Sequence, residues 1–151
     1  MRHMENKFDI ANDNFVINNE KNVINLNFRK GDIINYYFIF SWNKDIIKNG
    51  EYKLYFWNNL VKEKKLEINC INDLIKIFEN ENIFNLNLEN EYNSTAILGS
   101  GVEEWCLEIK INNKYNKINA YFLKNTNLRN VVKYIFNISE VKYDELIKPF
   151  F

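Results

Sequence analysis

The clearest feature of the chain is a period-two alternation of hydrophobic and polar residues in two segments. This alternation is typical of β-strands that bury one face. In 22–28 the hydrophobic positions are Ile24, Leu26 and Phe28, with Asn25 and Asn27 between them. In 103–111 they are Trp105, Leu107, Ile109 and Ile111, opposed by Glu104, Cys106, Glu108 and Lys110. Both segments are therefore predicted to be strands.

The most hydrophobic segment, 33–42, carries aromatic and β-branched residues on both of its faces. Residues of these types favour strands. We therefore expect a central strand that is covered, at least in part, on both sides. A further strand is expected over 51–57, and the Asn49-Gly50 pair before it favours a hairpin.

Shorter patterns fill the rest of the predicted sheet. Residues 15–17 are expected to form an edge strand, and 65–70 either a short strand or the beginning of a helix. Residues 112–116 are expected to form a hairpin loop that leads into a strand over 117–124. The polar stretch 85–101, with its two glycines, is expected to be the longest loop.

Two amphipathic helices are predicted from hydrophobic residues at helical spacing. Asn72 or Asp73 can cap the first helix, because both accept hydrogen bonds from backbone N–H groups. Its hydrophobic face is Ile71, Leu74, Ile75 and Phe78. The second helix follows the capping residues 125–127, and its face is Leu128, Val131, Val132, Ile135 and Phe136. A short helix is expected over 143–148.

The order of these elements is β-β-β-(β)-α-β-β-α, which predicts the α+β class. We expect one domain over 1–151, with a mainly antiparallel sheet of about five to six strands and two main helices packed on it. A chain of this length suits one domain. The second methionine, at position 4, suggests that residues 1–4 are a vector-derived addition or a disordered end.

Composition places the chain among soluble cytoplasmic proteins. Hydrophobic residues make up 46% of it, which is too many for a disordered chain. No stretch approaches 18 apolar residues, and the first residues lack the apolar core of a signal peptide. The two cysteines, Cys70 and Cys106, fit neither a disulfide framework nor a zinc site, and their separation in space is left open. Asparagine is about one residue in five, which we attribute to AT-rich codon usage.

Charge gives no reason to expect nucleic-acid binding. The formal net charge is zero, whereas proteins that bind phosphate backbones are usually basic. The densest basic run is Lys62, Lys64 and Lys65. Because Glu63 interrupts this run, we interpret it as a solvated turn.

Catalytic motifs are absent from the sequence, and no cofactor or metal is expected. The only histidine, His3, lies at the terminus, which removes histidine-based nucleophile pairs and His/Cys zinc sites. Carboxylates remain. Glu104 and Glu108 share one strand face, but at ~3.3 Å per residue their Cα atoms lie about 13 Å apart. Glu103 and Glu104, beside the glycine-bearing loop, are the best acidic site. The alternative is a solvated face paired with lysines across the strands.

Aromatic residues are in surplus on the predicted strands. Two helices cannot cover both faces of a five-stranded sheet, so either the sheet curls around its own core or an aromatic face is left for a partner. Aromatic side chains on strands are, however, more often simply core. The candidate partner or ligand surface is Tyr37, Trp42, Tyr55, Trp57, Glu103 and Glu104.

Several short motifs follow one another in a recognisable order. These are Gly50–Leu54, Leu74–Glu79, Ile83–Leu86, Trp105–Lys110 and Lys114–Ile118. Over roughly 33–137 the chain resembles a family of uncharacterised small bacterial proteins with a helix, an "FW-x-L" motif, a loop, "W-x-L-E" and a "G-K-Y-H" turn. The chain departs from that pattern at 99–102, at Asn116 in place of histidine, and in lacking a Trp-x-Pro after the last strand. The resemblance implies a fold and no activity.

The sequence is compatible with three functions. The first is a non-enzymatic protein-binding module, such as a toxin-immunity protein or a phage-type inhibitor, with a protein partner of unknown identity. The second is a small-molecule-binding domain with an aromatic-lined pocket closed by 85–101. The third is a carboxylate or metal-dependent enzyme that uses Glu103, Glu104 or Glu108.

Overall fold

The strands and helices of the protein are seen in a computed structural model, which describes residues 21–44, 49–89 and 102–147. The strands are β1 (Lys21–Lys30), β2 (Ile34–Asn43), β3 (Asn49–Phe56), β4 (Asn59–Glu67), β5 (Glu103–Ile111) and β6 (Lys114–Tyr121). The helices are α2 (Ile68–Asn80), the 3₁₀ turn η1 (Ile83–Asn85), α4 (Thr126–Ser139) and α5 (Tyr143–Ile147). The predicted strand over 15–17 and most of the predicted loop 85–101 lie outside the described residues.

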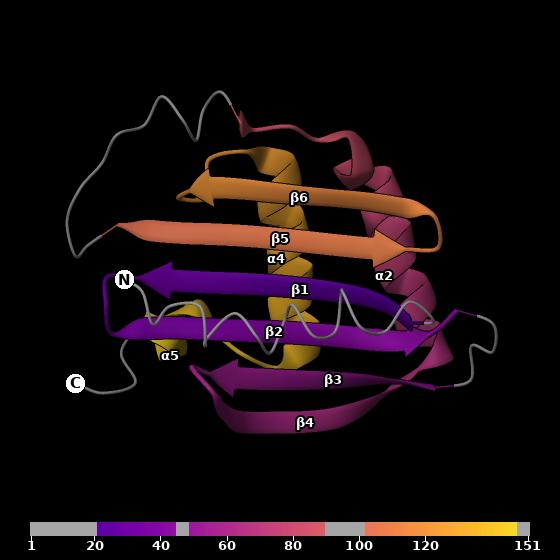
Figure 1. Ribbon diagram of the computed structural model, residues 1–151, viewed down its shortest axis with the longest axis horizontal. Helices are drawn as coiled ribbons and strands as arrows, with labels where there is room; N and C mark the ends of the chain where they lie inside the picture. The colour runs from indigo at the N-terminus through magenta and orange to yellow at the C-terminus, as the bar shows by residue number, and fades with distance from the viewer. Residues whose placement is uncertain (1–20, 45–48, 90–101, 148–151) are drawn as a thin grey trace.

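The six strands form one antiparallel sheet in the order β4-β3-β2-β1-β5-β6 (Figure 1). Neighbours along the chain pair as hairpins, and β1 also pairs with β5, so β1 and β2 lie at the centre. This arrangement confirms the predicted α+β class and the predicted central strand. It leaves β4 and β6 as the outermost strands of the described sheet.

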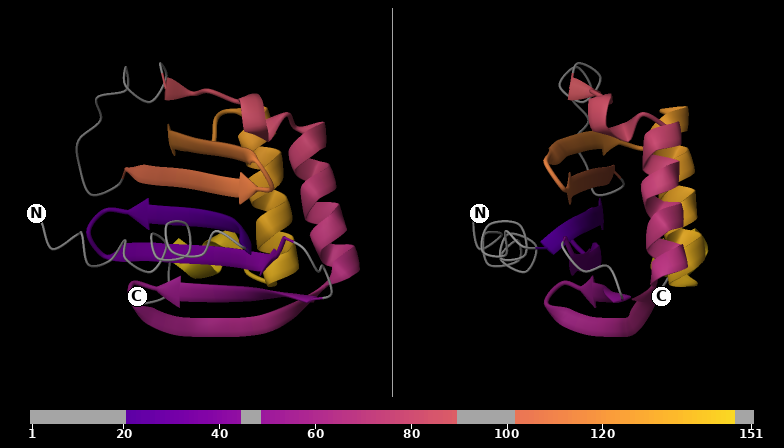
Figure 2. Two further views of the ribbon diagram at one scale, coloured as in Figure 1. Left: turned by 45° about the vertical axis from the view of Figure 1, so that its right-hand side comes forward. Right: turned by 90° about the vertical axis from the view of Figure 1, so that its right-hand side faces the viewer.

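The helices α2 and α4 lie side by side on one face of the sheet (Figure 2). Their hydrophobic stripes face the strands, which gives two layers with a core between them. Aromatic rings form much of this core: Phe38 lies 5.2 Å from Phe136 of α4, and Phe40 lies 4.8 Å from Tyr52, between ring centroids. No helix in the described ranges is long and apolar enough to span a membrane.

The second helix begins where the sequence predicts. Asn125 is the N-cap of α4, and its side chain accepts a hydrogen bond of 2.9 Å from the backbone N–H of Leu128. The five residues of its predicted hydrophobic face are all buried. The predicted short helix is confirmed as α5.

The first helix begins earlier than predicted. The caps proposed at Asn72 and Asp73 are wrong, because α2 starts at Ile68, directly after β4, with Glu67 at the N-cap. Glu67 makes no side-chain capping hydrogen bond. Packing accounts for the early start. Ile71 is buried in the first turn, and its Cδ1 would lie 3.1 Å from a Cβ added at Gly50. The absence of a side chain at Gly50 thus lets α2 pack closely over β3.

Strands also extend into two segments that the sequence predicted to be a turn and a loop. The basic run that we interpreted as a solvated turn lies in β4, paired with β3. The predicted five-residue loop 112–116 is a two-residue turn, since β6 already begins at Lys114. At that turn Asn112 adopts the left-handed conformation, with φ of 56°, and its N–H donates to Asn22 Oδ1 at 2.8 Å. Asparagine tolerates this conformation better than most residues, so no glycine is needed.

Candidate functional site

The outer face of the sheet, opposite the helices, contains a second buried cluster. Val23, Tyr37 and Ile39 form it, and the half-buried Tyr55 packs against it. Tyr37 has an exposed fraction of 0%, so it cannot belong to a partner surface in this fold. Trp42 lies in the main core on the helix side and is 2% exposed. The prediction that Tyr37 and Trp42 form part of a partner or ligand surface is therefore wrong.

Two asparagines of the same outer face, Asn27 and Asn35, are buried and hydrogen-bonded to each other. Asn27 Nδ2 donates to Asn35 Oδ1 at 2.7 Å and to the backbone oxygen of Tyr36 at 2.9 Å. The alternation in β1 predicted one more polar face, yet Asn25 and Asn27 are both buried. Strand β1 is thus covered on both faces, and its asparagine side chains belong to the interior.

The acidic candidates do not form a joint site. Glu103 and Glu104 are consecutive in β5, so their side chains point to opposite faces of the sheet. Glu103 accepts hydrogen bonds from the hydroxyl of Tyr143 and from Trp105 Nε1, the latter at 3.4 Å, and so joins β5 to α5. Within the described ranges, no three His, Cys, Asp or Glu side chains are grouped so that they could hold a metal ion.

Glu108, the third acidic candidate, lies on the outer face of β5. Its carboxylate accepts a hydrogen bond of 2.6 Å from the Tyr115 hydroxyl of β6. Burial, and then this hydrogen bond to the carboxylate, raise the pKa of Tyr115 above its usual value. The contact joins neighbouring strands across the hairpin and brings no second carboxylate to Glu108.

The remaining aromatic candidates, Tyr55 and Trp57, lie where two turns meet. The turn between β1 and β2 and the turn between β3 and β4 are adjacent at one end of the sheet (Figure 1). Large hydrophobic side chains are exposed there: Ile33 is 55% exposed, Leu60 48% and Val61 57%. We call the surface formed by Ile33, Tyr55, Trp57, Leu60 and Val61 the turn corner.

Trp57 is held at the turn corner in an unfavourable backbone conformation. Its φ is 55°, in the left-handed region that β-carbon crowding disfavours by roughly 1–2 kcal/mol. Two hydrogen bonds to the neighbouring turn hold it there: its backbone N–H donates to Asn35 O and its indole Nε1 donates to Ile33 O, both at 2.9 Å. Such strain persists where the surrounding structure fixes the residue, and it is frequent at functional sites.

Two open grooves border η1 beside the outermost strand β6. One, of about 520 Å³, is lined by 84–89 and 116–119, and the other, of about 540 Å³, by residues that include Phe78, Phe84 and Tyr115. Asn116 joins the two walls, since its Nδ2 donates to Ile83 O at 2.8 Å and to Leu86 O at 2.9 Å. Strands β2 and β3, which carry many aromatic residues, line neither of these two grooves. Neither groove is therefore the aromatic pocket that the sequence suggested.

The two cysteines lie in different layers and are both free thiols. Cys70 is in α2 and Cys106 is on the outer face of β5. Burial raises the pKa of the Cys106 thiol to about 11, and the carboxylates of Glu108 and Glu104 add to this effect, while Lys117 opposes it. A thiol with this pKa is almost wholly protonated at neutral pH and is a poor nucleophile.

We expect the alkylation rate of Cys106 to keep rising with pH until about 11. In the unfolded chain the thiol ionises near 9.0, so between about pH 9 and 11 the folded protein retains a proton that the unfolded chain releases. Burial of Cys106 therefore also weakens the fold as pH rises through this window. Iodoacetamide labelling of Cys70→Ser, followed by mass spectrometry, measures the profile. A rate that levels off near pH 9.0, as for the thiol in the unfolded chain, would contradict the assignment.

Comparison with known proteins leaves the family of the chain open. No protein-family model matches the chain, and no curated protein matches its sequence. The resemblance to small bacterial proteins with the W-x-L-E pattern therefore stays a prediction. What the fold and the site define is an α+β domain with an exposed hydrophobic corner.

Proposed function

We propose that the chain is a non-enzymatic protein-binding module and that the turn corner is its binding surface. The observation that carries this proposal is that Ile33, Leu60 and Val61 are exposed in and beside the same two adjacent turns that hold the strained Trp57. Folded monomers expose single hydrophobic residues routinely, but a group of them around a rigid tryptophan is typical of an interface.

The chemistry of the turn corner suits a protein partner better than a small ligand. Tryptophan and tyrosine dominate the binding energy of many interfaces, because they bury large areas and lose little side-chain entropy. The indole of Trp57 is already oriented by its bond to Ile33 O, so binding would cost little further ordering. None of the grooves described above borders Trp57 or Val61.

The finer version of this proposal is an inhibitor of an enzyme, such as a toxin-immunity protein or a phage-type inhibitor, acting in the cytoplasm. An inhibitor of this kind would act by covering a surface of its target. Fewer aromatic residues are available to a partner in the structure than the sequence suggested. Tyr37, Trp42 and Tyr52 are buried, and Tyr55 and Trp57 carry the proposal.

A second candidate is binding of a small polar molecule in the groove of about 520 Å³ beside β6. The observation that favours it is the lining, which combines Phe84 and Leu86 with amides such as Asn85 and Asn119. Small-molecule sites combine apolar walls with a few polar groups in this way. This groove and the turn corner are separate, so their variants can be told apart.

We expect Trp57→Gly to weaken partner binding strongly while leaving the fold intact. Glycine adopts the left-handed conformation freely, so the loss of the indole hydrogen bond is offset by relief of backbone strain. Loss of a tryptophan hot spot weakens binding by about 2 kcal/mol or more, which is about 30-fold in Kd. The tagged full chain is used to capture a partner from lysate of its source, and the purified pair is measured by calorimetry.

The matched control is Tyr115→Ala, which removes a 55% exposed aromatic ring from the other end of the sheet order. It should bind the captured protein as tightly as the wild type does. A second corner variant, Val61→Asp, should weaken binding as Trp57→Gly does. If both corner variants bind normally, or if no stoichiometric partner is captured, the turn corner is not the binding surface.

A further inference from the structure

Leu60 and Val61 of the turn corner lie on β4, a strand that is paired along one edge only. Strand β4 is outermost in the described sheet and pairs with β3 alone. The register of this pair shifts at Leu54 and Tyr55: Leu54 faces Lys62, whereas Tyr55 faces Leu60. Val61 therefore has no partner residue in β3. A bulge of this kind interrupts the hydrogen-bond ladder where the exposed residues lie.

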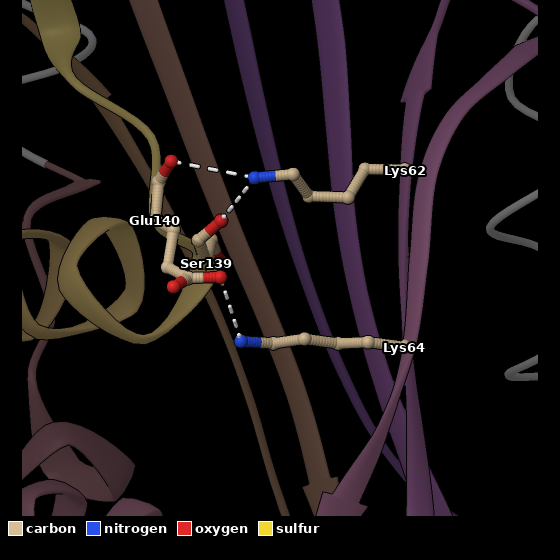
Figure 3. Close-up of polar contacts among 4 residues, drawn as sticks. All are labelled: Lys62, Lys64, Ser139 and Glu140. Carbon is tan, nitrogen blue, oxygen red and sulfur yellow. Dashed lines mark hydrogen bonds and ion pairs between the residues drawn. The ribbon is translucent and has the colours of Figure 1, made fainter.

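Lys62, the residue that follows the bulge, reaches across to the end of α4. Its Nζ donates to the backbone oxygens of Ser139 at 3.0 Å and of Glu140 at 3.3 Å (Figure 3). These carbonyls belong to the C-terminus of the helix, which leaves them without intrahelical partners and carries partial negative charge. The last turn of α4 contains no basic residue of its own. Lys62 supplies the cation from a different element of the fold.

Lys64 makes a second, more exposed contact in the same place. Its Nζ lies 3.5 Å from the Glu140 carboxylate, and the side chains are 37% exposed for Lys64 and 73% for Glu140. Exposed ion pairs of this type contribute little, because water and salt screen them. The bond that can restrain β4 is therefore that of Lys62, whose partners are backbone atoms fixed by the helix.

We infer that Lys62 is a positioning residue for the turn corner: it fastens the bulged start of β4 to α4 and so fixes Leu60 and Val61. The use of this restraint in binding rests on the proposed function, but the restraint itself does not. Without the lysine, Asn59 and Leu60 keep their pairing with β3, but the ladder beyond them is interrupted at Val61. The hydrophobic side chains would then have to be ordered when a partner binds, which weakens binding.

Hydrogen exchange of the full chain without any partner tests the restraint. Lys62→Met keeps the length of the side chain and removes its charge and donors. We expect the protection of β4 amides near the bulge to fall about tenfold, while amides of β1 and β5 keep theirs. Lys62→Arg retains a cationic donor and should restore most of the protection. Lys65→Met is the matched control, because Lys65 is an exposed lysine of the same strand that faces Glu51 across the pair.

Two results would overturn the inference. One is unchanged exchange near the bulge in Lys62→Met. The other is an equal loss of protection in β1, β4 and β5, which would mean that Lys62 supports global stability rather than the corner. Both are read in the free protein, so they are independent of partner capture. A local loss together with normal partner binding by Trp57→Gly would retain the restraint and reject the proposed surface.

Discussion

Trp105→Ala is expected to lower the free energy of unfolding by about 3–5 kcal/mol, the range for removing a large aromatic side chain from a core. Trp105 is buried in β5, and its ring lies 4.3 Å from Phe28 of β1 and 6.0 Å from Phe136 of α4, between centroids. The side chain thus touches the sheet and the helix layer together. Its removal leaves a cavity that neither layer can close alone.

Urea denaturation followed by circular dichroism measures this effect. The midpoint should fall strongly while the denaturant slope stays unchanged, because the same surface is exposed on unfolding. A domain of this size has a total stability of roughly 5–15 kcal/mol, so the variant should be close to unfolding. Trp105→Phe should lose less, and Tyr115→Ala, which removes an exposed ring and its hydrogen bond to Glu108, should lose only about 1 kcal/mol. A loss below 1 kcal/mol for Trp105→Ala would contradict the central position of this ring.

The elements with a single buried face could be predicted from the sequence because their period is visible there. Strand β5 was expected over 103–111 and is found there, and the capping role of Asn125 was contained in the 125–127 signal. In these segments burial on one side is the main physical constraint, and it sets the spacing of hydrophobic residues directly.

The errors have a different physical origin, because they arise where tertiary contacts decide. A run of lysines favours a solvated turn when it is considered alone, but in the structure it is extended as β4 because it pairs with β3. Lys62 of this run also donates to the end of α4, which is far away in sequence. The start of α2 was placed too late because packing of Ile71 over Gly50, rather than a capping side chain, fixes it.

The candidate surface could be predicted only in part. Tyr55 and Trp57, which the sequence offered as candidates for a partner surface, lie on the turn corner, whereas the sequence pattern did not point to Ile33, Leu60 and Val61. A signal was available in principle, since Ile33 follows the Gly31-Asp32 turn and Val61 lies close after Asn58-Asn59. The adjacency of the two turns depends on β2 pairing with β3, and the sequence of either turn does not contain that information.

For Tyr37 the sequence left open whether the side chain is exposed or buried, and in the structure it is buried. A strand with two hydrophobic faces is compatible with an exposed aromatic surface and with a second core. Tyr37 lies beside Val23 and Ile39 in a buried cluster, on the face opposite the helices. Burial also raises the pKa of its hydroxyl, as expected where water is excluded.

We therefore expect Tyr37→Ala to lower the free energy of unfolding by about 3–5 kcal/mol, as a core substitution does. Tyr55→Ala should cost less, because Tyr55 only packs against the edge of the cluster. Thermal and urea unfolding of both variants, with Tyr115→Ala as the exposed control, measure the difference. If Tyr37→Ala is as mild as the control, the outer face is a surface and aromatic residues of β2 return as binding candidates. A large loss instead means that both faces of β2 stabilise the fold, which leaves recognition to the turns at the end of the sheet.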